Sequence, residues 1–271
     1  MARFDLPQSK LRTRRRKRRV VVAILWFALI AFFAGGVVGL TYLPHLRVVE
    51  VSVEGVEGTE AQAVERIVRE HLEGRYVFVF PRNNVLIYPR SQIVSDLHAE
   101  YPIFATVEVR AKNLRTLHVV VAKRTPEALW CGEARAAPAP CFLLDEQGVA
   151  YELAAQSAGL AYTTYYGSLA GGVLPRQYLA EDPYRSLTAL AAALEAELGT
   201  RVASVEVDHA GDVRLHFAHG FEIIFVLEDG GGDVYERFVL ALQAQPFKEH
   251  PVSDFAYLDL RFGDRLYYKL K

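Results

Sequence analysis

The sequence predicts a single transmembrane helix followed by an α+β body outside the membrane. Residues 20–43 are 24 consecutive uncharged, mostly apolar positions behind a strongly basic tail, residues 1–19. The remaining 228 residues alternate strand-like and helix-like patterns and can form one or two domains of ordinary size. Because 51% of the chain is apolar and only 23% is charged, the composition excludes a disordered protein.

Charge asymmetry orients the apolar segment. Residues 1–19 hold nine basic side chains and one acidic one, whereas the rest of the chain has a net charge of −9. A helix over residues 20–43 would be about 36 Å long, enough to cross a hydrocarbon core of about 30 Å. The positive-inside rule then places the N-terminus in the cytoplasm and everything after residue 43 outside the membrane.

A signal peptide and a nucleic-acid-binding tail are the two other interpretations of this N-terminal region. A cleaved signal peptide has a shorter apolar region that ends in a small-residue cleavage site, whereas here Gly35 and Gly36 lie inside the run. Basic runs of this density also bind nucleic acid, but beside a spanning helix their plainer roles are topology and attraction to anionic lipid. We therefore expect an uncleaved, single-pass type II membrane anchor and no nucleic-acid partner.

The first outer region follows the order strand, helix, helix, strand, strand. Residues 46–53 alternate and are rich in β-branched side chains, and Thr59 and Gln62 have capping-box spacing before a helix that Gly74 can close. A second helix stops before Pro102. Alternating strands follow over residues 103–110 and 117–121. Two helices on one face of a small sheet account for every element.

The second outer region is predicted to be mainly antiparallel β structure with helices. Two strands, 142–145 and 149–152, flank a turn, and a strong helix over 184–198 ends at Gly199. Three alternating strands joined by short turns then form an antiparallel meander, at 202–208, 212–217 and 221–227. A last helix is expected at 234–244, with Asp233 as its cap.

The two cysteines, Cys131 and Cys141, both lie outside the membrane in this topology, where oxidation is permitted. Two separate thiols are the simpler reading. The compartment and the even count favour a disulfide, which would close an 11-residue loop and contribute about 3 kcal/mol.

Sequence motifs for catalysis are missing. No nucleophile elbow, zinc-protease motif, Walker loop or Rossmann glycine pattern occurs. His216 alternates with Leu215 and Phe217 and is expected to face solvent rather than a metal. Tyr162, Tyr165 and Tyr166 could stack on a glycan, but a packed loop explains them as well. The expectation is a non-enzyme with no metal and no cofactor.

Several segments, in this order, resemble the FtsQ/DivIB family of bacterial cell-division proteins. The segments are VSVEG at 51–55, Tyr101-Pro102, the R-x-P-x-A-x-W run that starts at Arg124, CFLLDEQGVAYE at 141–152, and Y-x-D-L-R-F at 257–262. Lys123 departs from the family pattern, which has an acid there, and 113–116 lacks the usual proline. The resemblance implies a POTRA domain (β-α-α-β-β) over 46–124 and a C-terminal β domain over 125–271.

The resemblance also implies a function. Such a protein would be a non-catalytic, membrane-anchored scaffold that links septal division proteins, with small single-pass partners resembling FtsB/DivIC and FtsL. It would lie in the cell membrane at the division septum. The alternative function is a membrane-anchored cell-wall-binding or wall-modifying protein that uses residues 162–166 as a carbohydrate site.

The final two strands are the expected docking place. Pairing Leu258 with Tyr268 and Leu260 with Leu266 keeps apolar side chains on one face and predicts a three-residue loop at 262–264. The last strand then lies at a sheet edge, where an extended partner segment can add a strand. Together with the resemblance, this predicts the following partner contacts: Tyr257, Phe262, Leu266, Tyr267, Tyr268, Lys269 and Leu270.

Overall fold

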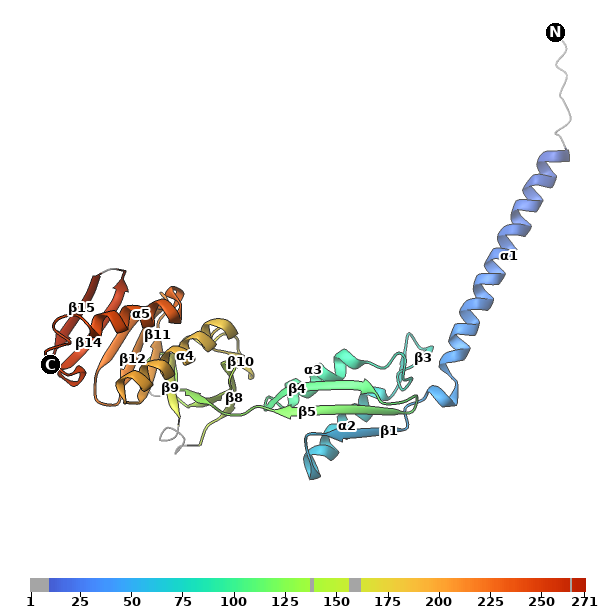
Figure 1. The fold of residues 1–271 in the computed structure, drawn as a ribbon. Coiled ribbons are helices and arrows are strands. Elements are labelled where there is room, and N and C mark those ends of the chain that lie inside the picture. Colours follow the sequence, from blue (N-terminus) through green and yellow to red (C-terminus); the bar gives the residue numbers. More distant parts are fainter. Residues whose placement is uncertain (1–9, 137–138, 156–161, 264) are drawn as a thin grey trace, which may run out of the picture. The chain divides into compact units, whose positions relative to one another are not determined.

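A computed structural model describes residues 10–136, 139–155, 162–263 and 265–271, with side chains from residue 17 onward. The chain forms two compact units (Figure 1). Unit 1 comprises residues 1–97 and 106–121, and unit 2 comprises residues 98–105 and 122–271. Residues 1–9 of the predicted basic tail lie outside the described residues.

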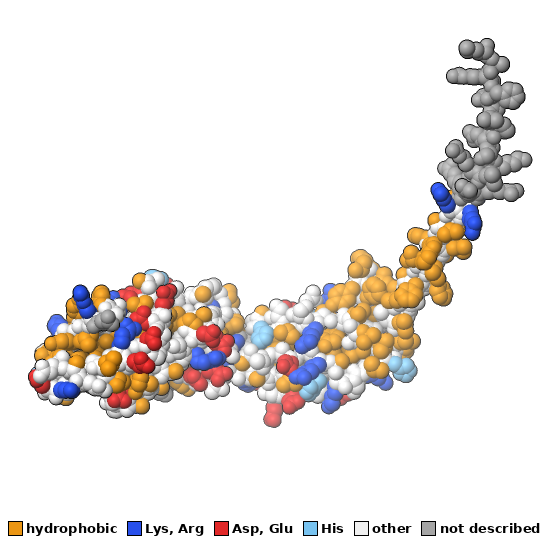
Figure 2. Space-filling model, turned by 45° about the horizontal axis from the view of Figure 1, so that its top comes forward, with side chains coloured by type: hydrophobic (Ala, Val, Ile, Leu, Met, Phe, Trp, Pro, Cys, Tyr) orange, Lys and Arg blue, Asp and Glu red, His pale blue; other side chains and the backbone are white. Residues whose placement is uncertain are grey.

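The first element, α1 (Lys10–Thr41), contains a segment from Lys17 to Thr41 that is long and apolar enough to span a membrane. Figure 2 shows the hydrophobic side chains along this helix. The helix begins ten residues before the predicted start because Arg and Lys are themselves good helix formers. It ends at Thr41, and a short 3₁₀ turn follows at Pro44–Leu46, because proline disfavours helical backbone just before it.

Unit 1 contains the predicted order of elements. A three-stranded sheet has the order β1-β5-β4, and β1 runs parallel to β5 with Val51 opposite Leu117. A two-stranded hairpin, β2–β3, was not predicted. The elements are β1 (Glu50–Glu54), α2 (Gly58–Leu72), β2 (Arg75–Tyr76), β3 (Phe80–Pro81), α3 (Arg90–Glu100), β4 (Phe104–Ala111) and β5 (Thr116–Lys123).

The helix cap predicted in this unit is wrong. The N-cap of α2 is Glu57, which makes no side-chain capping hydrogen bond, so Thr59 already lies inside the first turn. Each helix buries one apolar face, since Val64 and Val68 of α2 and Ile93 and Leu97 of α3 are all fully buried.

Unit 2 is built on a ten-stranded mixed sheet. Its order is β10-β8-β7-β6-β9-β11-β12-β13-β14-β15. Six of the neighbouring pairs are antiparallel and three are parallel, namely β6–β9, β9–β11 and β13–β14. The strands are β6 (Ala128–Trp130), β7 (Phe142–Leu144), β8 (Val149–Leu153), β9 (Thr163–Gly167), β10 (Arg176–Gln177), β11 (Val202–Val207), β12 (Asp212–Phe217), β13 (Glu222–Val226), β14 (Phe255–Phe262) and β15 (Arg265–Leu270).

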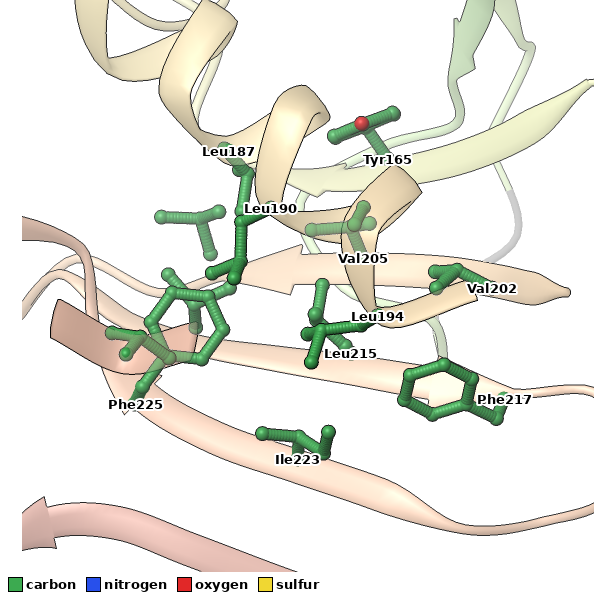
Figure 3. Close-up of a cluster of buried hydrophobic side chains, with 14 of the residues drawn as sticks. Tyr165, Leu187, Leu190, Leu194, Val202, Val205, Leu215, Phe217, Ile223 and Phe225 are labelled. Atoms are coloured by element: carbon green, nitrogen blue, oxygen red, sulfur yellow. The ribbon is translucent and has the colours of Figure 1, made fainter. Parts of the chain in front are cut away.

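Two helices of unit 2, α4 (Glu181–Leu198) and α5 (Gly231–Leu242), supply the other half of the core. Leu187, Leu190 and Leu194 of α4 point toward the sheet side chains of β11, β12 and β13 (Figure 3). Helix α4 ends as predicted at Gly199, whose φ of 61° is left-handed. The predicted Asp233 cap of α5 is wrong, because the helix begins two residues earlier, at Gly231.

Candidate docking edge at the C-terminus

The last two strands form a hairpin at one end of the ten-stranded sheet. Strand β14 is held by packing against the core, since Phe255, Leu258 and Leu260 are buried there. Strand β15 pairs with β14 on one side and is the terminal strand in the sheet order. All seven predicted contact residues lie on this hairpin, which therefore presents a strand edge on a rigid support.

The predicted loop length is wrong. Leu258 pairs with Tyr268 as expected, but Phe262 pairs with Arg265, which leaves a two-residue connection, Gly263 and residue 264, the latter outside the described residues. A register shift between Asp259 and Phe262 reconciles the two pairings, and the expected Leu260–Leu266 pair falls in this irregular stretch. Such a bulge inserts one extra residue, so it moves the side chains beyond it to the opposite face.

The bulge places Phe262 beside Tyr267 on the face of the hairpin away from the core. Their ring centroids lie 5.0 Å apart at an interplanar angle of 78°, an edge-to-face pair. Phe262 is 52% exposed and Tyr267 is 50% exposed. The guanidinium carbon of Arg261 lies 5.5 Å from the Phe262 ring centroid. This aromatic pair has the exposure and composition of an interface anchor.

The other face of β15 turns toward the core. The Tyr268 ring packs against Phe255 at 5.8 Å and Phe247 at 6.1 Å between centroids. Leu266 is half-buried against the core and lines a pocket of about 240 Å³ between α5 and the hairpin. The pocket is also lined by Leu240, an exposed leucine that the sequence interpretation did not single out. The feature of the sequence that could have identified Leu240 is a leucine on the outer side of an otherwise amphipathic helix.

The two remaining predicted contacts on β15, Lys269 and Leu270, pair with β14. Lys269 lies opposite the half-buried Tyr257, and Leu270 lies opposite Phe255. The C-terminus is held in place, because the Lys271 amide donates to the Asp254 carbonyl at 2.9 Å and Lys271 Nζ donates to the His219 carbonyl at 3.0 Å. The edge strand is therefore ordered to its last residue.

An ion-pair network lies within the irregular stretch of β14, between Asp259 and Phe262. The Arg261 guanidinium donates to both Asp259 oxygens, at 3.0 and 2.7 Å, and also to Asp212 at the start of β12. Burial alone would raise the pKa of Asp259, but the hydrogen bonds and charge of Arg261 outweigh it and lower that pKa below 3.8. The same bonds raise the pKa of Arg261. The network ties β14 to β12 across the intervening strand β13.

The two cysteines lie away from this edge and are bonded to each other. The Cys131 and Cys141 sulfurs are 1.98 Å apart. The bond joins the residue after β6 to the residue before β7, two strands that pair antiparallel. The predicted disulfide is therefore present in the structure, where it closes the end of this hairpin.

The middle member of the tyrosine cluster packs into the core. Tyr165 lies in strand β9, not in a loop, and it is buried with its ring 5.8 Å from Tyr178 and 5.5 Å from Tyr184. Tyr178 donates to the Tyr166 carbonyl at 2.8 Å. Burial of the phenol raises the pKa of Tyr165. The central ring of the cluster is committed to the core.

The expectation that His216 faces solvent is wrong. The ring is buried, with Nδ1 3.1 Å from a Glu222 oxygen and Nε2 3.8 Å from a Glu206 oxygen. The neighbouring strands cover it on the sheet face opposite Leu215 and Phe217, which point into the core. In the part of the chain that the structure describes, no group of three or more His, Cys, Asp or Glu side chains is placed to hold a metal ion.

Comparison with known proteins adds no family assignment: no protein-family model matches the chain, and no curated protein matches it. The site is therefore defined by its geometry. It consists of an ordered edge strand, an exposed aromatic pair on one face, and a leucine-lined pocket on the other.

Proposed function

We propose that the chain is a non-catalytic, membrane-anchored scaffold of the bacterial cell-division complex, and that strand β15 is its docking edge. The observation that carries the proposal is the terminal position of β15 in the sheet, with half-exposed aromatic and leucine side chains along it. Main-chain groups on such an edge give affinity to an added strand, and flanking side chains give it specificity.

The resemblance to the FtsQ/DivIB family supports the choice of partner. On this proposal, residues 46–124 form a POTRA domain, in keeping with the β1-β5-β4 order and the two helices α2 and α3. The partner that adds to β15 is a small single-pass division protein of the FtsB/DivIC type, itself paired with an FtsL-type protein. The aromatic pair, Phe262 and Tyr267, contacts its side chains.

The apolar helix supports the membrane part of the proposal. The span Lys17–Thr41 follows a basic tail, so residues 44–271 would lie outside the membrane with the N-terminus in the cytoplasm. A reporter that is active only in the cytoplasm, fused after Lys271, should be silent in the full-length chain. Activity of that reporter would contradict the topology, and loss of the first 40 or so residues from the mature protein would identify a signal peptide instead.

Localisation tests the division role. A fluorescent protein fused to the cytoplasmic N-terminus of the full chain should concentrate at midcell in dividing cells. A general cell-wall binder would label the whole envelope. Uniform labelling of the envelope, with the reporter topology intact, would reject the scaffold and leave the anchor standing.

A further inference from the structure

The β2–β3 hairpin of unit 1 ends in an exposed apolar tip. Val77 and Phe78 form the centre of the turn and are 80% and 92% exposed, and Val79 beside them is also exposed. The turn is closed by a hydrogen bond from the Val79 amide to the Tyr76 carbonyl at 2.9 Å. The tip therefore presents three consecutive apolar side chains away from the protein.

The backbone of this tip is unusual for such side chains. Val77 has a φ of 47° and Phe78 a φ of 62°, and among the described residues they are the two non-glycine positions with positive φ. A turn with two positive φ angles normally uses Asn and Gly, and a β-branched residue in this region is a clear outlier. Valine and phenylalanine thus occupy positions where both the backbone and exposure to water disfavour them.

The tip lies where the apolar helix ends. The Tyr42 hydroxyl donates to the Val79 carbonyl, and the buried Asn84 side chain donates to the carbonyl of Thr41, the last residue of α1, at 2.9 Å. The Val85 amide donates to the Leu46 carbonyl at 2.9 Å. These bonds join the hairpin and the segment after it to the first residues that leave the apolar span.

Further exposed apolar residues and arginines surround the same place. Leu43 and Leu86 are exposed. Figure 2 shows hydrophobic side chains gathered around the end of α1. The Arg75 guanidinium carbon lies 6.0 Å from the Tyr42 ring centroid, and that of Arg82 lies 5.0 Å from the Tyr76 ring centroid. Tyrosines next to arginines are typical of the layer between lipid headgroups and acyl chains.

We infer that residues 77–79 insert into the outer interfacial layer of the same membrane that α1 spans, as a second membrane contact. The inference rests on the proposed anchor. Two attachment points, the helix and the hairpin tip, restrict how the folded residues after α1 turn about the helix axis, which a single helix does not. The occupant of the apolar tip is lipid, because hydrogen bonds hold it at the end of the span.

The test uses the full-length chain in vesicles of phosphatidylcholine and phosphatidylglycerol, labelled with an environment-sensitive fluorophore at Phe78→Cys. The native cysteines are bonded to each other and do not take the label without reductant. The matched control is Val173→Cys in unit 2, because Val173 is 86% exposed and likewise apolar. A separate variant, Leu86→Cys, carries the label outside the hairpin turn. It still reports contact with lipid if the label at 78 distorts the turn.

Flotation of the vesicles reports the anchor, and the fluorophore reports the tip. We expect the label at 78 to be blue-shifted, protected from iodide and quenched severalfold more by nitroxide-labelled lipid than the label at 173. If the protein floats but labels 78 and 86 both behave like the label at 173, the inference is overturned and the anchor stands. If the mature protein does not float, the anchor fails and the inference fails with it.

Discussion

The two ends of the ten-stranded sheet are edges of opposite kinds. Strand β10 has two residues, and its side chains return to the protein: Arg176 donates to the Leu169 and Ala170 carbonyls, and Gln177 donates to the Gln147 carbonyl. Strand β15 has six residues and exposes aromatic and leucine side chains along its length. One edge is short and covered by its own polar groups, and the other is long and open.

On the proposed function, this difference determines which edge of the sheet can accept a partner strand. A short edge with inward hydrogen bonds resists unwanted strand pairing, whereas a long edge with apolar side chains invites it. Lys269 near the end of β15 limits promiscuous pairing without closing the edge. The asymmetry supports the assignment of docking to the C-terminal edge.

The largest effect on stability is expected when a buried side chain of β14, the strand that pairs with β15, is shortened. Leu258→Ala deletes a fully buried side chain in β14 and should cost about 2–5 kcal/mol in the free energy of unfolding, because it leaves a cavity. Thermal or denaturant unfolding of the full chain in detergent measures this. A change below about 0.5 kcal/mol would mean that β14 is not part of a packed core.

Removal of the exposed aromatic should affect capture and leave the fold intact. Phe262→Ala should weaken binding of the FtsB/DivIC-type partner by about 1–3 kcal/mol, because aromatic side chains are common hot spots. Its melting temperature should stay near that of the parent chain, because half of the ring is already exposed. Unchanged capture would place the site elsewhere, and a collapsed melt would assign Phe262 to the core.

The ion-pair network under the edge should be visible in the acid range. Arg261 holds the Asp259 pKa below 3.8, so the ionised pair stabilises the fold above that pH, and the contribution is lost as pH falls through the folded-state pKa. Arg261→Gln removes both guanidinium hydrogen bonds to the buried carboxylate, leaves it the main-chain bond from residue 261, and should cost about 1–3 kcal/mol at neutral pH.

In this variant the guanidinium no longer lowers the Asp259 pKa. Burial then raises that pKa against the two lowering influences that remain, the main-chain bond from residue 261 and the Arg214 charge. Its stability should therefore respond less steeply to acid below pH 3.8 than that of the parent. Melting temperature measured from pH 2 to pH 7 in both proteins tests this. Parallel curves would show that the pair does not set the acid response.

The smallest effect is expected at the covered edge. Arg176→Ala removes two hydrogen bonds to loop carbonyls near the surface and should change stability by less than about 1 kcal/mol. It should not change partner capture, so it serves as the matched control for Phe262→Ala. Loss of capture in this variant would make the two edges equivalent and remove the basis of the comparison.

Periodicity predicted the parts of the fold that local pattern controls. The meander β11–β12–β13 and the helix α4 lie close to their predicted positions, because alternating and helical apolar patterns determine their buried faces. Strand β9 was missed, because it is a short run, TTYYG, whose strand identity comes from parallel pairing with two strands distant in sequence. Strands β6 and β10 were also not predicted, because they have only three and two residues, too few to show an alternating pattern.

The candidate site could be predicted as a place but not in detail. Alternation placed a terminal strand at 266–270, and β15 contains these residues but begins one residue earlier, at Arg265. The bulge after Asp259 could not be predicted, because the three-residue and two-residue loops each satisfy part of the apolar pattern. The bulge is what brings Phe262 beside Tyr267, so the aromatic pair emerged only from the structure.

Amide hydrogen exchange of the full-length chain, with and without the FtsB/DivIC-type partner, tests the docking edge most directly. Strand addition should slow exchange of amides within 265–270, whose outward groups gain main-chain bonds, and leave 176–177 at the other edge unchanged. Protection confined to β15 is the predicted result. Partner binding that leaves the β15 amides exchanging at their free rate would contradict docking at this edge.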